Sequence, residues 1–305
     1  MADHTGPVVR SAGKRGKRTP RHVPELRIEN FTTDTPAPED PLPSSYEAAL
    51  GIPQDGWGML GNDVYGDCVE AATEHIRMAD AFDVTTGSFE SGFVVPTTAL
   101  TERVYFDYGL AEGEPGPDPD EGTCIADWLA FAFRNRMIEG YAEIPTDIDS
   151  IRRYALQFRC VLLGLELPDE AEEQFESGQC WSVSASNEPD PNEGHGVAFI
   201  GWSTTNDFVV TWGEKWCCAP DFLPACVDEA WVIDTNRLFE QNGYDKHKLV
   251  ETIRSLNGSS VSSVPLAPAR STEDDPLVGF AKALEQFAIR FATAASRLVE
   301  RLEAK

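Results

Sequence analysis

The chain has 305 residues, of which 41% are hydrophobic and 10% aromatic, so it can bury a large core and is not disordered as a whole. Its formal net charge of −26 argues against a nucleic-acid-binding role for the body of the protein. The first 22 residues are the exception, with six basic residues against one acidic residue. We expect residues 1–23 to form a flexible basic arm that can touch nucleic acid, an acidic partner or the chain's own acidic body.

Cysteine usage and hydropathy suggest a location for the chain. The start of the sequence lacks the apolar stretch of a secretory signal, and no apolar run is long enough for a membrane span. We therefore expect a cytoplasmic protein without membrane contact, in which the seven cysteines are mostly free thiols. Cys217, Cys218 and Cys226 lack the usual spacing of zinc ligands, and the acidic loop 112–122 lacks the regular ligand pattern of a calcium site. No metal or other cofactor is expected.

The middle of the chain predicts an α+β domain. Residues 24–56 form a proline-rich strap, and a dense domain follows over 57–256. Its first half has helical periodicity, and its second half has short β-rich runs between turn signals. The expected helices cover 68–82 and 126–137, and the expected strands cover 160–167, 197–202, 207–212 and 229–233. This order indicates a helical lobe and a β lobe with a cleft between them.

The C-terminal end predicts a separate helix. Residues 257–275 read as a Ser/Pro/Ala linker, and an Asp–Pro start signal precedes a helix over 276–305. Its apolar residues alternate steps of three and four, which is the seam of a coiled coil. We expect self-association or docking on a partner through this helix; the alternative is that it folds back onto the domain.

Two distant residues carry the chemistry. Cys68 directly precedes a helical pattern, and a helix N-terminus lowers the pKa of a thiol. His195 opens an apolar β run and is the candidate base. Acyl transfer also needs donors for the oxyanion, and the backbone N–H of Cys68 with the side-chain amide of Asn62 could supply them. Taken singly, Cys68 could equally be a buried inert thiol and His195 a satisfied core histidine.

These segments resemble a known family. The segment with Asn62 six residues before Cys68 and Gly66 two residues before it resembles the nucleophile segment of papain-like cysteine peptidases. Residues 194–202 resemble the histidine segment of that family, and residues 209–216 resemble its Asn-Ser-Trp-Gly segment. A narrower likeness, over 57–68, 209–213 and 226–231, is to a papain-like group from actinobacteria and their phages. The resemblance implies a two-lobed α+β fold with Cys68 as nucleophile, His195 as base and Asn62 as oxyanion donor.

The sequence departs from the family pattern near the expected site. Asn62 stands in place of a longer Gln, and Asp67 puts a carboxyl group beside the nucleophile. The position expected to orient His195 is Val210, which cannot accept a hydrogen bond. Thr211, Asp207 or Asp228 are the candidates to replace it.

Two functions from different classes therefore stay open. The first is a cysteine peptidase or amidase that attacks a peptide or isopeptide carbonyl through the Cys68–His195 pair. The second is a catalytically inactive papain-like structural or interaction protein, such as a phage virion component assembled through the helix over 276–305. The pair favours the first, whereas the arm and the C-terminal helix favour the second, because hydrolysis needs neither.

Overall fold

The fold is that of a computed structural model, which describes residues 10–33, 41–114, 120–235 and 238–257. Contacts group nearly all of these residues into one unit. Residues 90–95 belong to a second unit, and their described part is a loop with one turn. The helix expected over 276–305 and most of its linker lie outside the described residues.

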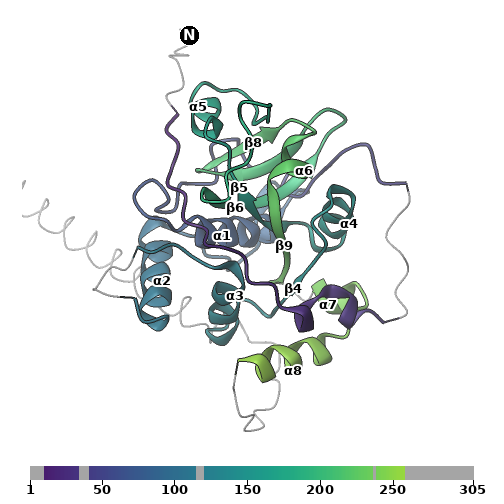
Figure 1. The fold of residues 1–305 in the computed structure, drawn as a ribbon. Helices are drawn as coiled ribbons and strands as arrows, with labels where there is room; N and C mark the ends of the chain where they lie inside the picture. The colour runs from purple at the N-terminus through teal and green to yellow at the C-terminus, as the bar shows by residue number, and fades with distance from the viewer. Residues whose placement is uncertain (1–9, 34–40, 115–119, 236–237, 258–305) are drawn as a thin grey trace, which may run out of the picture. The chain divides into compact units, whose positions relative to one another are not determined.

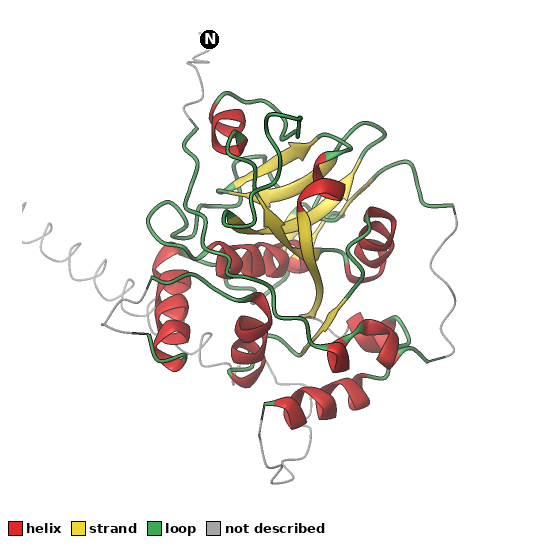
Figure 2. Ribbon diagram, in the orientation of Figure 1, coloured by secondary structure: helices red, strands yellow, loops and turns green. Residues whose placement is uncertain are grey.

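An antiparallel sheet forms one half of the main unit (Figure 2). Within the described residues it has seven strands, in the order β4-β9-β5-β6-β7-β8 with β1 paired to β6. The strands are β1 (Tyr46–Glu47), β4 (Gly140–Glu143), β5 (Val161–Glu166), β6 (Gly194–Trp202), β7 (Asp207–Thr211), β8 (Glu214–Cys218) and β9 (Val227–Asp234). A separate hairpin joins β2 (Phe82–Asp83) to β3 (Ser88–Phe89). All four strands predicted from the sequence are present.

Helices pack around the sheet, most of them on one side of it (Figure 1). The central one is α1 (Cys68–Ala81), which packs on β6 and buries every residue except Arg77. The others are α2 (Thr98–Ala111), α3 (Ile125–Arg134), α4 (Ile148–Phe158), α5 (Ala171–Glu176), α6 (Phe222–Cys226), α7 (Leu238–Gln241) and α8 (Lys246–Leu256), with short 3-10 turns η1 (Pro24–Leu26) and η2 (Ile28–Phe31). The two predicted helices correspond to α1 and α3. The expected α+β class is thus confirmed.

Several elements were not predicted, and side-chain caps mark the start of three of them. Thr97 accepts from the Leu100 N–H at the start of α2, Asp147 from the Ser150 N–H at α4, and Asp245 from the Lys248 N–H at α8. Such caps satisfy backbone donors that a helix cannot pair internally. The strand β8 was also missed, because the predicted strand before it ends at a Trp–Gly turn that continues as a hairpin.

The cysteines correct one expectation in part. Cys180 and Cys217 form a disulfide that the sequence analysis did not predict. The other five cysteines are free and buried. Among the described residues, no helix combines the length and the apolar composition of a membrane span.

Candidate active site

Cys68 is the first residue of α1, where the strand β6 comes close to the helix. The backbone N–H of Gly196 donates to Cys68 Sγ at 3.2 Å. This approach needs a glycine, because a Cβ at position 196 would lie 2.9 Å from Val69 Cγ2. The predicted nucleophile therefore lies at a helix N-terminus, against the peptide unit that follows His195.

His195 has one ring nitrogen bound and one free. Its Nε2 lies 2.8 Å from Thr211 Oγ1 on the neighbouring strand β7. Among the described residues, Nδ1 has no hydrogen-bond partner. When the Thr211 hydroxyl accepts from Nε2–H, the imidazole carries its lone pair on Nδ1 and can take a proton there. The Trp212 ring covers the imidazole at a centroid distance of 5.0 Å.

Thr211 thus fills the role that Val210 cannot. The two other candidates for this role have different partners. Asp207 is buried and pairs with Arg152 at 2.8 Å, while Asp228 pairs with Lys17 at 2.6 Å. The sequence named three possible acceptors, and the pairing of β6 with β7 selects one of them.

We expect Thr211→Val to destabilise the chain by about 1–3 kcal/mol, because it leaves a buried imidazole nitrogen without its partner. The matched variant Thr211→Ser keeps the hydroxyl and should cost less. Urea unfolding of both variants measures the difference. Equal losses would show that the hydroxyl does not hold His195.

Asn62 is buried and its side-chain amide binds peptide carbonyl groups. Its Nδ2 donates to the carbonyl oxygens of Lys14, at 2.9 Å, and of Tyr65, at 3.1 Å. Its own backbone carbonyl accepts from the Lys14 N–H at 2.5 Å. The residue predicted to hold an oxyanion is therefore engaged with a peptide segment that lies in the site.

That segment is the basic arm, which runs along the main unit from α5 toward η1 (Figure 1). The arm was expected to be flexible, but residues 14–18 are bound to the body through their backbone. Lys17 N–H donates to the Gly194 carbonyl at 3.1 Å, Arg18 N–H to the Thr123 carbonyl at 2.8 Å, and Thr123 N–H to the Gly16 carbonyl at 2.6 Å. The backbone N–H of Gly16 also lies close enough to the Cys68 thiol to lower its pKa. The arm therefore covers the candidate nucleophile.

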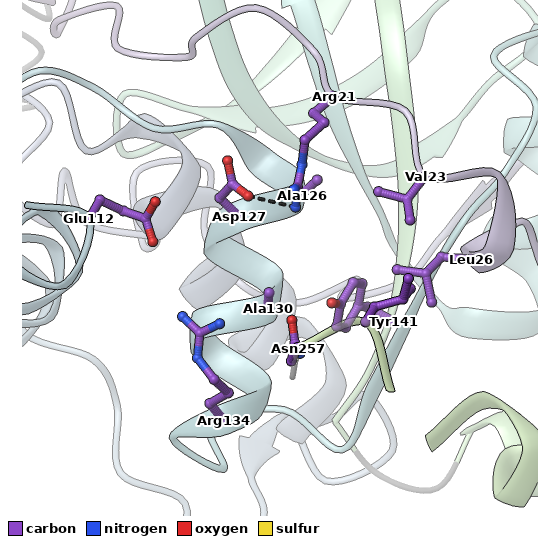
Figure 3. A pocket seen from close by; sticks show the side chains of 11 residues that line it. Arg21, Val23, Leu26, Glu112, Ala126, Asp127, Ala130, Arg134, Tyr141 and Asn257 are labelled. Carbon is purple, nitrogen blue, oxygen red and sulfur yellow. Dashed lines mark ion pairs between the residues drawn. The ribbon is translucent and has the colours of Figure 1, made fainter. Parts of the chain in front are cut away.

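Side-chain ion pairs hold the arm on both sides of the thiol. Arg15 pairs with Glu172 at 3.1 Å and with Glu193 at 2.9 Å, and Arg18 pairs with Glu114. Further on, Arg21 reaches Asp127 of α3 at 2.6 Å, on the rim of a hollow that also contains Arg134 and Tyr141 (Figure 3). The arm binds because a basic segment and an acidic body have complementary charges. Contact with the chain's own body was one of the three possibilities expected from the sequence.

Burial under the arm makes the pair electrically neutral. Burial raises the pKa of the Cys68 thiol to about 12, and the backbone N–H groups of Gly196 and Gly16 offset only part of this. Burial also lowers the pKa of His195 to about 3, and the cations of Arg15 and Lys17 lower it further. With the arm bound, the site holds a thiol and a neutral imidazole rather than a thiolate–imidazolium pair.

Asp67 does not act as a charge beside the nucleophile at neutral pH. It is fully buried, and neither carboxyl oxygen has a hydrogen-bond partner among the described residues. Burial, with repulsion from Glu70 and Glu102, raises its pKa to about 9. The carboxyl group is therefore mostly protonated at pH 7, and its effect on the thiol is smaller than the sequence suggested.

The chain is similar to a number of solved structures, of which two are described here. One is xylellain, a cysteine protease from Xylella fastidiosa, with a TM-score of 0.48 and 13% identity over 75% of this chain and 98% of xylellain. The other is digestive procathepsin L 3 of the Tenebrio molitor larval midgut, with a TM-score of 0.42 and 13% identity over 69% of this chain and 76% of that one. No protein-family model matches the sequence, and no curated protein matches it either. At this identity and these TM-scores, neither likeness assigns an activity to the chain.

Proposed function

We propose that the chain is a papain-like cysteine peptidase or amidase domain that is held inactive by its own N-terminal arm. Cys68 attacks the carbonyl carbon of a peptide, and His195 takes the thiol proton at Nδ1 and later gives it to the leaving amine. Water then hydrolyses the thioester with His195 as base. One observation carries the proposal: a thiol at the N-terminus of α1 lies against Gly196, next to a histidine whose Nε2 is bound by Thr211 and whose Nδ1 is free.

Two further contacts support this proposal. Asn62 Nδ2 already donates to a peptide carbonyl, which is the interaction that an oxyanion donor makes. The arm shows that an extended peptide segment fits directly over the thiol. In the arm, however, the group that acts on the Cys68 thiol is the backbone N–H of Gly16, so we treat the bound segment as an occupant rather than a reacting substrate.

The test labels the thiol in a full chain whose arm has been released. Lys17→Glu places a third carboxylate against Asp228 and Glu229 and should expel the arm. Iodoacetamide labelling from pH 5 to 9, mapped by mass spectrometry, should then modify Cys68 faster than the buried Cys124, with a rate that persists below pH 7. Labelling below pH 7 requires a thiolate–imidazolium pair, so it should disappear in the His195→Ala variant. Labelling of Cys68 no faster than Cys124 would contradict the proposal.

A second candidate function is peptide binding without catalysis. The observation that favours it is the complete burial of Cys68 and His195, both uncharged, beneath a well-anchored segment. The same experiment separates the two candidates, because a binding protein would release its arm without gaining a reactive thiol.

A further inference from the structure

The arm inserts a lysine into a pocket of the main unit. Lys17 is 8% exposed, and among the described residues it is the only Lys or Arg that is buried. Its Nζ lies 2.6 Å from Asp228 Oδ2 and 3.6 Å from Glu229 Oε1, both at the start of β9. Burial of an unpaired ammonium group has a large desolvation cost. The two carboxyl groups offset this cost and so allow Lys17 to be buried.

The floor of this pocket is a glycine of β5. A Cβ at position 164 would lie 2.6 Å from Lys17 Cε, 2.5 Å from Glu229 Cγ and 2.8 Å from Asp228 Oδ1. The lysine stem therefore occupies the space that a side chain at Gly164 would otherwise fill. Any larger residue there would close the pocket.

One carboxyl group of the pocket is held by a residue of β9 itself and not only by the arm. Trp231 Nε1 donates to Glu229 Oε2 at 2.8 Å, which fixes that carboxyl group from within β9. Glu229 Oε1 and Asp228 Oδ1 are buried and make no hydrogen bond with the described residues. They lack a hydrogen bond even with Lys17 in place, so the Lys17 ammonium group offsets them through its charge, and a cation fits the pocket better than a neutral side chain.

The body of the protein also restricts the residue that precedes the lysine. The hydrogen bonds on either side of Lys17 are made by backbone atoms and do not by themselves select a side chain. At Gly16, however, a Cβ would collide with the backbone of Gly66, so only glycine fits there. Outside this pair, the flanking basic residues face Glu172, Glu193 and Glu114.

We propose that the Gly164–Asp228–Glu229 pocket is a lysine-recognition subsite, and that the surface beneath residues 14–18 binds extended basic peptides with a Gly–Lys pair. Lys17 is its occupant in cis, and a peptide of the same chemistry occupies it in trans once the arm leaves. As a statement about substrates, this inference rests on the function proposed above. As a statement about binding, it is independent of the thiol.

Two measurements on the full chain test the subsite. Hydrogen exchange should show that Lys17→Glu removes protection from residues 14–18. The Lys17→Glu chain is then titrated with a fluorescent peptide, acetyl-Arg-Gly-Lys-Arg-amide, and with the same peptide carrying Met for Lys. The Lys peptide should bind about 10- to 100-fold more tightly, because only its ammonium group can form ion pairs with Asp228 and Glu229.

The role of the charge in the pocket is tested with two matched variants, each made in the Lys17→Glu chain. Asp228→Asn should remove most of the preference for Lys over Met. Glu172→Gln removes a carboxylate that faces the arm from a half-exposed position and should leave that preference unchanged. Continued protection of the arm in Lys17→Glu, equal affinity of the two peptides, or no binding of either at millimolar concentration would overturn the inference.

The outcomes separate the subsite from the catalytic proposal. The titration is repeated with Cys68→Ala, which cannot react with the peptide. Selective binding of the Lys peptide by a chain whose Cys68 is unreactive would support the lysine subsite and contradict the catalytic proposal. A reactive Cys68 together with equal binding of both peptides would support the catalytic proposal and contradict the lysine subsite.

Discussion

Lys17→Glu is expected to raise the rate at which iodoacetamide alkylates Cys68 by at least about 30-fold at pH 7.5. With the arm bound, burial holds the pKa of the thiol at about 12, against an ordinary value of 9.0. Release of the arm exposes the thiol. It also reduces the burial of His195 and removes the cations of Arg15 and Lys17, so the pKa of His195 rises from about 3 toward 6.5.

The size of the effect follows from two opposing changes. A fall of three units in the thiol pKa raises the thiolate population about 1000-fold, because the thiolate is the reacting species. A less basic thiolate is also a weaker nucleophile, which costs about 30-fold over the same three units. About 30-fold remains before the gain in access to the thiol is counted.

The control is a charge reversal elsewhere on the arm. Lys14→Glu changes the same charge, but Lys14 is half exposed and pairs with Asp120 only at 3.5 Å. An exposed ion pair contributes little to stability, so this variant should change the alkylation rate by only a few fold. If both variants accelerate alkylation equally, overall charge rather than the Lys17 pocket holds the arm.

Asp67→Asn is expected to stabilise the chain by about 2 kcal/mol at pH 7. Burial raises the pKa of Asp67 from 3.8 to about 9, so the native state keeps a proton that the unfolded chain releases above about pH 4. The stabilising contribution of this group is therefore complete below pH 4 and is lost as the pH rises toward 9. An amide does not titrate and removes this loss.

Urea unfolding at several values of pH measures this prediction. The native chain should lose stability between pH 5 and 8, and Asp67→Asn should lose less over that range. The pH dependence that remains in Asp67→Asn comes in part from two other buried carboxyl groups. Burial raises the pKa of Glu70 to about 8 and that of Glu229 to about 7. The control is Asp63→Asn, which changes an exposed carboxylate four residues before Asp67 and should leave the stability unchanged. A destabilised Asp67→Asn variant with an unchanged pH slope would contradict the argument.

The fold class and the segments that hold the site could be predicted from local patterns. Helical spacing after Cys68 predicted α1, and the apolar run after His195 predicted most of β6, because a core-facing element repeats its apolar residues at its own period. Helices α4 and α8 were missed even though each begins at an aspartate cap. Their short amphipathic runs lay in regions that the sequence analysis assigned to no element.

The sequence by itself determined which residues could react and that the chain joins a basic arm to an acidic body. Residue type decides both, since a thiol, an imidazole and a run of cations keep their chemistry in any fold. Only the tertiary structure decided that Thr211 binds His195, that burial protonates Asp67, and that Lys17 lies between Asp228 and Glu229. These results depend on strand pairing, on the depth of burial and on the missing side chain at Gly164, which arise when segments distant in sequence pack together.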